Sequence, residues 1–295
     1  MDELQKARRE FAEWLHNNKH IRSDALTKAF ATVPREAFLG PPPWKIWDPI
    51  VSPIITPGTI PYESHHDPKV LYRDVLVALD AERGINNGQP SLWAIVYDRI
   101  DARAGERIVH IGCGVGYYTA ILAELVGKNG SVIGLDIDQN LLARASAALG
   151  GWANVTIKEC NGASYSEGAA DIIVVNAGIT HPLDVWLDAL NPRGRLMVPL
   201  TFDGYRAEAG YGGFFLIVRK TEGLAARFIC PTGILHFSGA RDGEASKRLM
   251  NAWRKDESWL SRISSLRRDR HDEDGSCWLH GVGYCFSARE AGTIH

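Results

Sequence analysis

Between residues 107 and 199 the chain repeats one pattern, in which a short apolar segment is followed by a helical stretch. The apolar segments are 107–111, 131–136, 155–158, 171–175 and 195–199, and the helical stretches are 117–126, 138–149 and 182–190. Continuous apolar strands are typical of a parallel sheet that is buried on both faces by helices. The alternation therefore predicts an α/β fold with a right-handed, doubly wound sheet.

The chain before this region predicts helices and an irregular segment. Residues 2–17 and 24–32 have the spacing of amphipathic helices, and Ser23 is a suitable N-cap for the second. Residues 40–68 contain eight prolines together with large apolar side chains. Because proline lacks an N–H donor, we expect an ordered wrap or lid there and no central strand.

After residue 199 the pattern changes to antiparallel strands and a helix. Strands are expected at 214–219 and 226–229, a helix at 244–256, and a hairpin within 262–287 around a solvated charge run. We therefore divide the chain into three parts. They are an N-terminal helical and Pro-rich cap (1–100), a central domain (101–237) and a C-terminal α+β extension (238–295).

Composition excludes several classes of protein. The 33 basic and 35 acidic residues nearly balance, so we expect no nucleic-acid or membrane partner. No apolar run approaches the ~18 residues of a membrane span, and the charged N-terminus does not resemble a secretory signal. The five cysteines are scattered, and neither they nor the His65-His66-Asp67 cluster predicts a metal site. A cytoplasmic protein is expected, and oligomeric state is not predicted.

The strongest local signal is a glycine loop between a strand and a helix. Gly112, Gly114 and Gly116 let the backbone turn sharply and approach a ligand, and the following helix offers free N–H donors. Asp136 ends the next strand, twenty residues after Gly116, where a carboxylate can accept both hydroxyls of a ribose. Asp138 is expected to cap a helix instead. Together these features indicate a cofactor that contains adenosine.

The loop pattern distinguishes between cofactors. A dinucleotide site requires G-x-G-x-x-G, whereas this chain has G-x-G-x-G followed by Tyr117, which disfavours a nicotinamide oxidoreductase. The G-x-G-x-G form with an acidic second strand is similar to the S-adenosylmethionine loop of Rossmann-like methyltransferases. We therefore expect S-adenosyl-L-methionine as the cofactor.

Several further segments resemble the protein-L-isoaspartate O-methyltransferases, in the order in which that family has them. The matching segments are Val33-Pro-Arg-Glu-Ala-Phe38, Tyr72-Arg-Asp74, Gln89-Pro90, His110-Ile-Gly-Cys-Gly-Val-Gly-Tyr-Tyr-Thr-Ala120, Asn154-Val155, Asn161-Gly162, Asp171-Ile-Ile-Val-Val175 and Leu190-Asn-Pro-Arg-Gly-Arg-Leu-Met-Val-Pro199. The resemblance implies a divergent member with a Rossmann-like methyltransferase fold.

The resemblance also implies which residues bind the cofactor. They are His110, Gly112, Gly114, Gly116, Tyr117, Tyr118, Asp136 and Asn161. Asn161 matches the aspartate of the family's G-D-G motif and can accept the adenine amino group through its amide oxygen. It can equally be a turn residue before Gly162. One of the two tyrosines would border the methionine end of the cofactor, and ordinary packing is the alternative.

The chain departs from the family at the segment beside the transferred methyl group. Aligning Gln89-Pro90 places Gly88 where the family has a serine or threonine. Asn86, Asn87 or Ser91 could substitute for the missing hydroxyl. We take Asn87, Gln89 and Asn176 as the candidate catalytic residues. Asn176 follows the fourth strand of the pattern, where it can orient the acceptor or serve equally as a capping residue.

The chemistry of the acceptor decides which side chains are needed. A carboxylate is already ionised at pH 7 and needs no general base, which fits a peptide, protein or small-molecule carboxylate as the substrate. Three questions stay open. The first is whether the acceptor is an isoaspartyl residue or a dedicated substrate. The others are whether the protein is instead a small-molecule O- or N-methyltransferase that uses His181 as its base, or a non-catalytic protein that only binds the cofactor.

Overall fold

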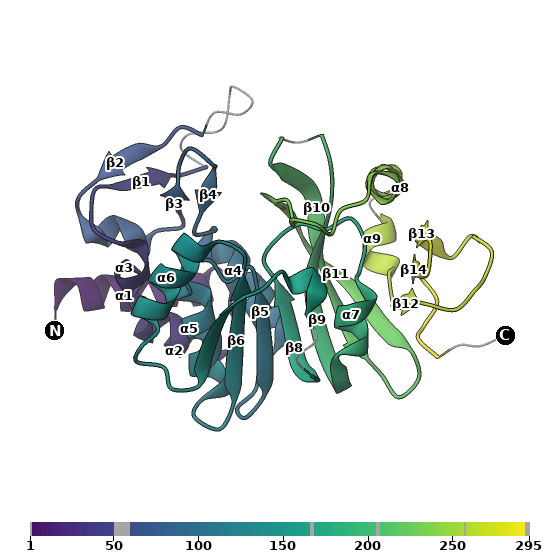
Figure 1. Cartoon of the computed structure of the whole chain (residues 1–295), viewed down its shortest axis with the longest axis horizontal. Helices are drawn as coiled ribbons and strands as arrows, with labels where there is room; N and C mark the ends of the chain where they lie inside the picture. Colours follow the sequence, from purple (N-terminus) through teal and green to yellow (C-terminus); the bar gives the residue numbers. More distant parts are fainter. Residues whose placement is uncertain (1, 50–59, 166–167, 205–206, 257, 293–295) are drawn as a thin grey trace. The chain divides into compact units, whose positions relative to one another are not determined.

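The structure is a computed structural model that describes residues 2–49, 60–165, 168–204, 207–256 and 258–292 (Figure 1). It divides into two compact units. The first comprises Met1–Glu106 and Cys113–Glu159, and the second comprises Arg107–Gly112 and Cys160–His295. The chain therefore passes from the second unit back to the first within the glycine loop, between Gly112 and Cys113.

Two predicted helices begin the first unit. Helices α1 (Glu3–Asn17) and α2 (Asp24–Thr32) pack against each other. Ser23 caps α2, because its Oγ accepts the Leu26 N–H at 3.3 Å. The other helices of this unit are α3 (Glu36–Leu39), the 3-10 helix η1 (Pro68–Tyr72), α4 (Pro90–Ile100), α5 (Tyr117–Val126) and α6 (Gln139–Ala148).

The Pro-rich segment corrects one prediction. We expected no central strand between residues 40 and 68, but β1 (Trp44–Trp47) lies between β2 (Glu63–His65) and β3 (Leu76–Asp80). The sheet order is β2-β1-β3-β4, with β4 at Ile85–Asn86. The four residues of β1 contain no proline, so each can donate to a neighbouring strand, and the prolines flank them. The prolines and isoleucines within 50–59 lie outside the described residues.

A parallel strand pair completes the first unit. Strand β6 (Ser131–Asp136) pairs in parallel with β7 (Val155–Glu159), in a register that places Val132 opposite Val155. Helix α6 connects β6 to β7, helix α5 precedes β6, and both helices pack against β6. The predicted strand–helix alternation over 117–158 is confirmed.

The second unit contains a mixed sheet in the order β13-β14-β12-β11-β10-β9-β8-β5. Strand β5 (Arg107–Ile111) pairs in parallel with β8 (Ala170–Val175), and β8 pairs in parallel with β9 (Leu190–Phe202). All later pairings are antiparallel. The remaining strands are β10 (Ala209–Arg219), β11 (Leu224–Leu235), β12 (Ser265–Arg267), β13 (Cys277–Gly281) and β14 (Tyr284–Ser287).

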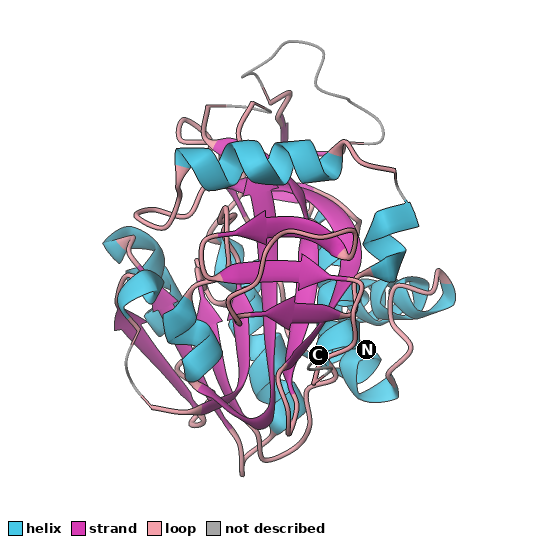
Figure 2. Cartoon of the chain, turned by 90° about the vertical axis from the view of Figure 1, so that its right-hand side faces the viewer, coloured by secondary structure: helices cyan, strands magenta, loops and turns pink. Residues whose placement is uncertain are grey.

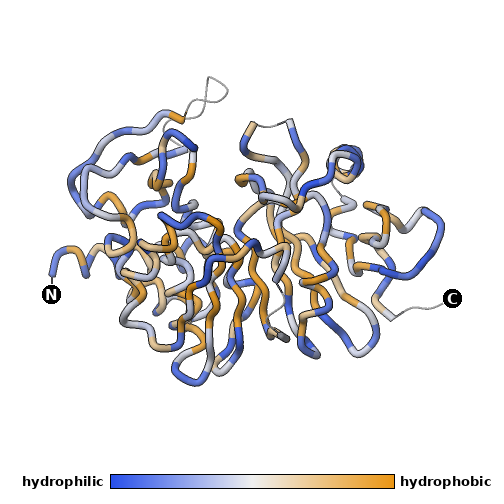
Figure 3. The backbone as a smooth tube through the Cα atoms, in the orientation of Figure 1, coloured by the Kyte–Doolittle hydropathy of each residue, from blue (hydrophilic) through white to orange (hydrophobic). Residues whose placement is uncertain are grey.

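The apolar runs account for the interior of this sheet. Residues 172–175 of β8 are fully buried, and β5, β8 and β9 are predominantly orange in the hydropathy colouring of Figure 3. Four short helices lie among the described residues of this unit, and Figure 2 shows the longest of them, α8, running across the strands. They are η2 (Gly162–Ser164), α7 (Asp184–Asp188), α8 (Gly243–Trp253) and α9 (Ser258–Arg262).

One predicted strand proves to be longer than expected. The sequence predicts a strand at 195–199, but β9 already begins at Leu190 and includes Asn191-Pro-Arg-Gly194. The register between β8 and β9 shifts between Ala170 and Ile172, and Arg193 has φ +65°. These four residues therefore form an irregularity inside the longer strand.

Among the described residues, no helix combines the length and the apolar character needed to span a bilayer.

Candidate functional site

The glycine loop has a conformation that non-glycine residues rarely adopt. Gly112, Gly114 and Gly116 have φ values of 75°, 55° and 87°. A Cβ on Gly116 would lie 2.6 Å from Cδ1 of the buried Leu149, whereas a Cβ on Gly114 would meet nothing within 4 Å. Gly116 is thus required by packing, and the backbone at Gly114 faces open space.

Helix α5 begins directly after the loop without a side-chain cap. The uncapped first turn leaves backbone N–H groups for an anion. Tyr117 and Tyr118, in this turn, are 1% and 4% exposed. Burial raises the pKa of Tyr117 to about 12 and the pKa of Tyr118 well above its usual value, so both phenols are neutral. Both rings pack against other aromatic side chains, Tyr117 against Phe38 and Tyr118 against Trp93.

Asp136 is joined to the loop by a hydrogen bond. The Gly114 N–H donates to its Oδ2 at 2.8 Å, and Oδ1 accepts from the N–H groups of Ile137 and Asp138 at 2.8 and 3.1 Å. The carboxylate is therefore fixed beside the open face of the loop. Ile137 is 51% exposed, so an apolar side chain lies in solvent directly after this acid.

Asp138 has the capping role that the sequence predicts. Its Oδ1 accepts from the N–H groups of Asn140 and Leu141 at 3.0 and 3.1 Å, at the start of α6. Its Oδ2 accepts from Arg83 Nη1 at 2.5 Å. Both oxygens are thus used within the fold.

The segment 86–89 lies next to the start of α5. The Tyr118 hydroxyl donates to the Gly88 carbonyl at 3.3 Å. Asn87 is 7% exposed, and its side-chain Nδ2 is buried without a hydrogen-bond acceptor. Gln89 Nε2 donates to Asp74 Oδ2 at 2.7 Å, so its carboxamide is already engaged. Of the two predicted catalytic residues on this segment, Asn87 is the one with an unused donor.

Gly88 cannot be converted to the family's hydroxyl residue by a simple replacement. It has φ +72°, and a Cβ there would lie 2.2 Å from Nε1 of the buried Trp93. Its carbonyl also accepts from Arg35 Nη2 at 3.4 Å. The segment is therefore built around Trp93 and a glycine.

His110 and Asn176 lie together in the second unit. His110 is fully buried on β5, and burial lowers its pKa to about 4, against a hydrogen bond with the Asn176 side chain that raises it. The imidazole is therefore neutral at pH 7. Asn176 follows β8, and its N–H donates to the Ile111 carbonyl at 2.8 Å. Because His110 has no exposed surface, its side chain cannot contact a ligand directly in this structure.

Asn161 forms an Asx cap at the start of η2. Its Oδ1 accepts from the Ala163 N–H at 3.0 Å, and its Nδ2 donates to the Ser238 carbonyl at 3.2 Å. The turn role that the sequence allows is therefore present, and one lone pair of the amide oxygen is left for a further donor.

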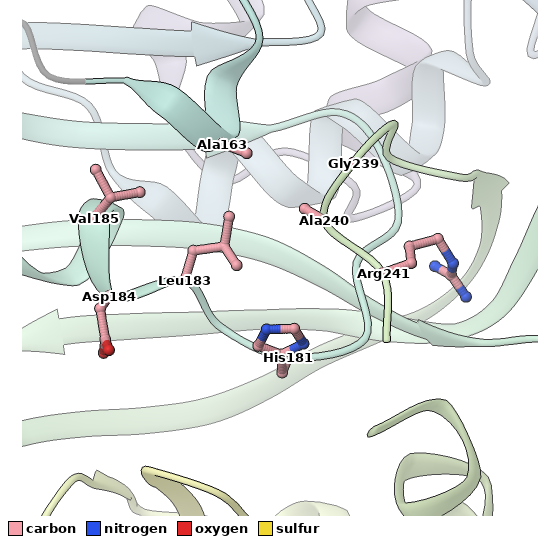
Figure 4. Close-up of a pocket in the computed structure, with 8 residues that line it drawn as sticks. All are labelled: Ala163, His181, Leu183, Asp184, Val185, Gly239, Ala240 and Arg241. Atoms are coloured by element: carbon pink, nitrogen blue, oxygen red, sulfur yellow. The ribbon is translucent and has the colours of Figure 1, made fainter. Parts of the chain in front are cut away.

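A pocket of about 390 Å³ in the second unit contains His181. Figure 4 shows its imidazole between Leu183 and Arg241. The Thr180 hydroxyl lies 3.0 Å from His181 Nδ1, and the ring stacks on Tyr284 at a centroid distance of 6.0 Å. Burial lowers the pKa of His181, so a neutral imidazole is favoured. The other lining residues are Ala163, Asp184, Val185, Gly239 and Ala240.

Comparison with known proteins decides the family. The sequence model of the protein-L-isoaspartate(D-aspartate) O-methyltransferase family matches residues 59–209, just over half of the 295 residues. The chain belongs to this family. A protein-L-isoaspartate O-methyltransferase from Ignicoccus hospitalis is 25% identical over 236 residues, which cover 79% of this chain and 97% of the relative.

Solved structures of the family share the fold. One protein-L-isoaspartate O-methyltransferase matches with a TM-score of 0.64 at 22% identity, over 88% of this chain and 72% of that one. A second, from Plasmodium falciparum in complex with S-adenosyl-L-homocysteine, matches with a TM-score of 0.59 at 20% identity, over 78% of this chain and 98% of that one. The predicted α/β, Rossmann-like fold class is confirmed.

Two positioning residues were not recognised from the sequence. Asp74 accepts from Gln89, from the Ser91 N–H and from the Ser91 hydroxyl at 2.7–2.8 Å. Arg35 is fully buried and donates to the carbonyls of Leu71 and Val75, each at 2.9 Å. Both residues lie in segments that carry the family resemblance, and this placement was the available signal.

Proposed function

We propose that this protein is an S-adenosylmethionine-dependent methyltransferase whose acceptor is a carboxylate on a dedicated peptide, protein or small-molecule substrate. The observation that carries the proposal is the hydrogen bond between Gly114 and Asp136. It joins the turn that can approach a ligand to the acid that can hold a ribose. Membership of the protein-L-isoaspartate O-methyltransferase family supports the same reaction type.

The residues around the loop fit the cofactor's parts. Asp136 retains acceptor capacity for ribose hydroxyls beyond its three backbone contacts. The exposed Ile137 side chain suits the face of an adenine base. The uncapped start of α5 suits a carboxylate such as that of the methionine end. S-adenosylmethionine, when bound, supplies a methyl group on a sulfonium, which leaves alignment of the acceptor to the protein.

Asn87 is the proposed contact for the acceptor. Its buried Nδ2 lacks an acceptor in the fold, and such orphaned donors are rare because burial without a partner costs free energy. A carboxylate oxygen would satisfy this donor and would be oriented by it. No proton needs to be removed, since the carboxylate is already ionised at pH 7.

The environment of Gly88 favours a dedicated substrate over isoaspartyl residues in damaged proteins. The family's hydroxyl side chain has no room beside Trp93. Because this segment is built around a glycine and Trp93 and lacks the family's hydroxyl residue, we infer that the acceptor differs too.

His181 supports a second candidate function. It lines a pocket, and its lowered pKa keeps the imidazole able to accept a proton at pH 7. A hydroxyl or amine acceptor would need such a base. This alternative predicts a rate that falls when His181 is replaced by glutamine, whereas the carboxylate proposal does not require His181.

The test is methyl transfer to a panel of acceptors. The full chain is incubated with S-adenosylmethionine labelled in the methyl group and with an isoaspartyl peptide, a normal aspartyl peptide and small-molecule carboxylates. Methyl esters are read as methanol released by base. We expect base-labile methyl on a carboxylate, and little turnover of the isoaspartyl peptide.

Replacing Asn87 tests the acceptor's charge. Asn87→Ala removes a hydrogen bond to a charged group, worth about 1.5–3 kcal/mol, so kcat/KM should fall about 10- to 100-fold. Asn87→Asp has nearly the same shape but repels a carboxylate, and it should be worse than the alanine variant. The matched control is Asn251→Asp, on the exposed face of α8.

Two results would reject parts of this proposal. An Asn87→Asp variant as active as wild type would show that the acceptor is not a carboxylate held there. Tight cofactor binding without labelling of any acceptor would favour the non-catalytic alternative.

A further inference from the structure

The C-terminal part of the second unit brings together four side chains of the types that bind transition metals. They are His271, Cys277, His280 and Cys285, and one ligand atom from each lies within 4.8 Å of the others. Cys277 and Cys285 are 3% and 0% exposed, and the two histidines are half-buried. The residues come from the loop before β13, from β13 itself and from β14.

The strand register explains how this group forms. His280 on β13 stands opposite Cys285 on β14, so the two side chains share one face of the hairpin. In a regular strand, Cys277 would point to the other face, because it precedes His280 by an odd number of residues. The register shifts between Cys277 and Leu279, and this bulge brings Cys277 to the same face. Strand periodicity alone separates these residues, so their grouping cannot be predicted from the sequence.

The separation between His271 and Cys277 fits a tetrahedral metal centre. His271 Nε2 lies 3.8 Å from Cys277 Sγ. Zinc binds cysteine sulfur at about 2.3 Å and histidine nitrogen at about 2.0–2.1 Å. At the tetrahedral angle these bond lengths place the sulfur and the nitrogen about 3.6 Å apart. The rings of His271 and His280 are nearly perpendicular, at 80° with centroids 4.9 Å apart, so they do not stack and their nitrogens can converge.

The surroundings of the ligands provide independent support. His271 Nδ1 lies 2.9 Å from the Asp269 carbonyl, which fixes the ring so that Nε2 faces the cluster. Histidines that bind metals commonly have such a carbonyl or carboxylate on the other nitrogen. The Asp274 N–H points to Cys277 Sγ at 3.4 Å. His280 Nδ1 is buried without a hydrogen-bond partner, and a metal ion would account for it.

We propose that His271, Cys277, His280 and Cys285 bind one zinc ion in a structural site. Two thiolates and two imidazoles in tetrahedral arrangement are a donor set that zinc prefers. Four protein ligands leave no position for water or substrate, so the site is structural and not catalytic. It joins the charged loop of residues 268–276 to the β13–β14 hairpin.

Zinc binding is balanced by the release of two protons. On binding, the Cys277 and Cys285 thiols each lose a proton to solvent and form a sulfur–zinc bond, and the imidazoles donate neutral lone pairs. The two thiolates cancel the charge of Zn²⁺, and no oxidant or reductant is required.

The site has a consequence for the His181 pocket. Tyr284, next to Cys285 on β14, stacks on the His181 ring. A zinc ion that holds the hairpin would therefore hold this tyrosine against the pocket, and metal removal should loosen both.

The experiment measures metal content and coordination on the full chain. Protein purified from zinc-supplemented medium should contain about one zinc ion per chain, measured by inductively coupled plasma mass spectrometry. After the metal is removed, titration with cobalt(II) should give the visible bands of a tetrahedral thiolate complex, saturating at about one equivalent. Chelation should also lower the melting temperature.

Variants distinguish this site from adventitious binding. Cys285→Ser and His271→Ala should each lose most of the zinc and weaken the cobalt bands, whereas Cys230→Ser, a cysteine on β11 outside the group, should keep both. Because Cys285 is fully buried and its variant could fail to fold, His271→Ala on the loop keeps the test decisive.

Three results would overturn the proposal. They are zinc far below one equivalent with no thiolate–cobalt bands, stoichiometric zinc that survives both cluster variants, and a Cys277–Cys285 disulfide found by peptide mass in freshly purified protein. None of these measurements uses S-adenosylmethionine, so their outcome is independent of the proposed methyl transfer.

Discussion

At the end of β6, two carboxylates separated by one residue have different surroundings. Asp136 accepts from a backbone N–H on the glycine loop, while Asp138 caps α6 and pairs with Arg83. The capping role can be predicted from local sequence, because an N-cap side chain bonds only to backbone N–H groups two or three residues further on. Asp136 could be assigned to the cofactor site because the order of the strands places the ends of neighbouring strands close together.

Replacing two glycines of the loop should have different effects. Gly114→Ala strains a left-handed residue by about 1 kcal/mol but fits in space, so the unfolding free energy should change little beyond that. Its methyl group would enter the open face and should weaken S-adenosylhomocysteine binding at least about tenfold, a loss of about 1.4 kcal/mol. Urea unfolding and calorimetric titration measure the two quantities.

Gly116→Ala is the comparison. Its Cβ would overlap Leu149, and crowding of a packed core adds about 1–3 kcal/mol to the strain. We therefore expect the larger loss of stability there. Normal cofactor affinity in Gly114→Ala would mean that the ligand does not approach the chain at this residue.

Other roles at this scale could not be read from the sequence. The family motif assigns three residues to the cofactor, namely His110, Tyr117 and Tyr118. Whether such a side chain can contact a ligand depends on its burial. All three prove to be packed inside the fold. Solvent exposure depends on distant segments, such as Phe38 beneath Tyr117, which no local pattern reveals.

At the scale of elements, buried polar side chains join helices to the segments around the site. Arg35 precedes α3 and ties it to the 71–75 segment and to Gly88. Asp98 on α4 holds the start of α2, because its Oδ1 accepts from the N–H groups of Arg22 and Ser23 at 2.7 and 3.1 Å. Hydrogen bonds are directional, so these contacts fix the orientation of the helices, which apolar packing alone would leave undefined.

Asp98 predicts a dependence of stability on pH. Burial alone would raise its pKa, but the hydrogen bonds and charge of Arg22 and the Ser23 N–H lower it below the ordinary value. The stabilisation is therefore complete above the unfolded-state pKa of about 3.9 and is lost as the pH falls through the folded-state value. Asp98→Asn should cost about 2 kcal/mol at pH 7, and its difference from wild type should shrink below about pH 4.

Urea unfolding of both proteins across this range tests the prediction. The control is Asp101→Asn, whose side chain is 64% exposed in its pair with Arg103, and which should change the unfolding free energy by less than about 0.5 kcal/mol. A difference between Asp98→Asn and wild type that stays constant with pH would contradict the assignment.

Elements with a clear period were predictable and those built from long-range pairing were not. Helix α2 has the bounds that its cap and following proline predict, and β5, β6 and β8 follow from apolar runs. Strand β1 was missed because four residues among prolines carry no period of their own. Its partners, β2 and β3, lie more than fifteen residues away in sequence.

At the scale of the whole molecule, the family match covers the middle of the chain, and the proposed zinc site lies outside it. The family match covers residues 59–209, whereas the proposed zinc site lies beyond residue 270. Neither the cysteine spacing nor the charge run predicted this site, because it depends on a bulge and on pairing between strands. The division into a cap, a central domain and an extension stays a prediction.

The central claim is that Asp136 and the glycine loop hold the cofactor. Calorimetric titration of S-adenosylhomocysteine into wild type, Asp136→Ala and Asp138→Ala tests it most directly. Loss of charge-assisted hydrogen bonds worth about 3 kcal/mol should weaken binding to Asp136→Ala about 100-fold. Asp138→Ala loses a helix cap and the ion pair with Arg83 but no proposed ligand contact, and it should bind within about threefold of wild type. Equal affinity in wild type and Asp136→Ala, or no binding to wild type, would contradict the account.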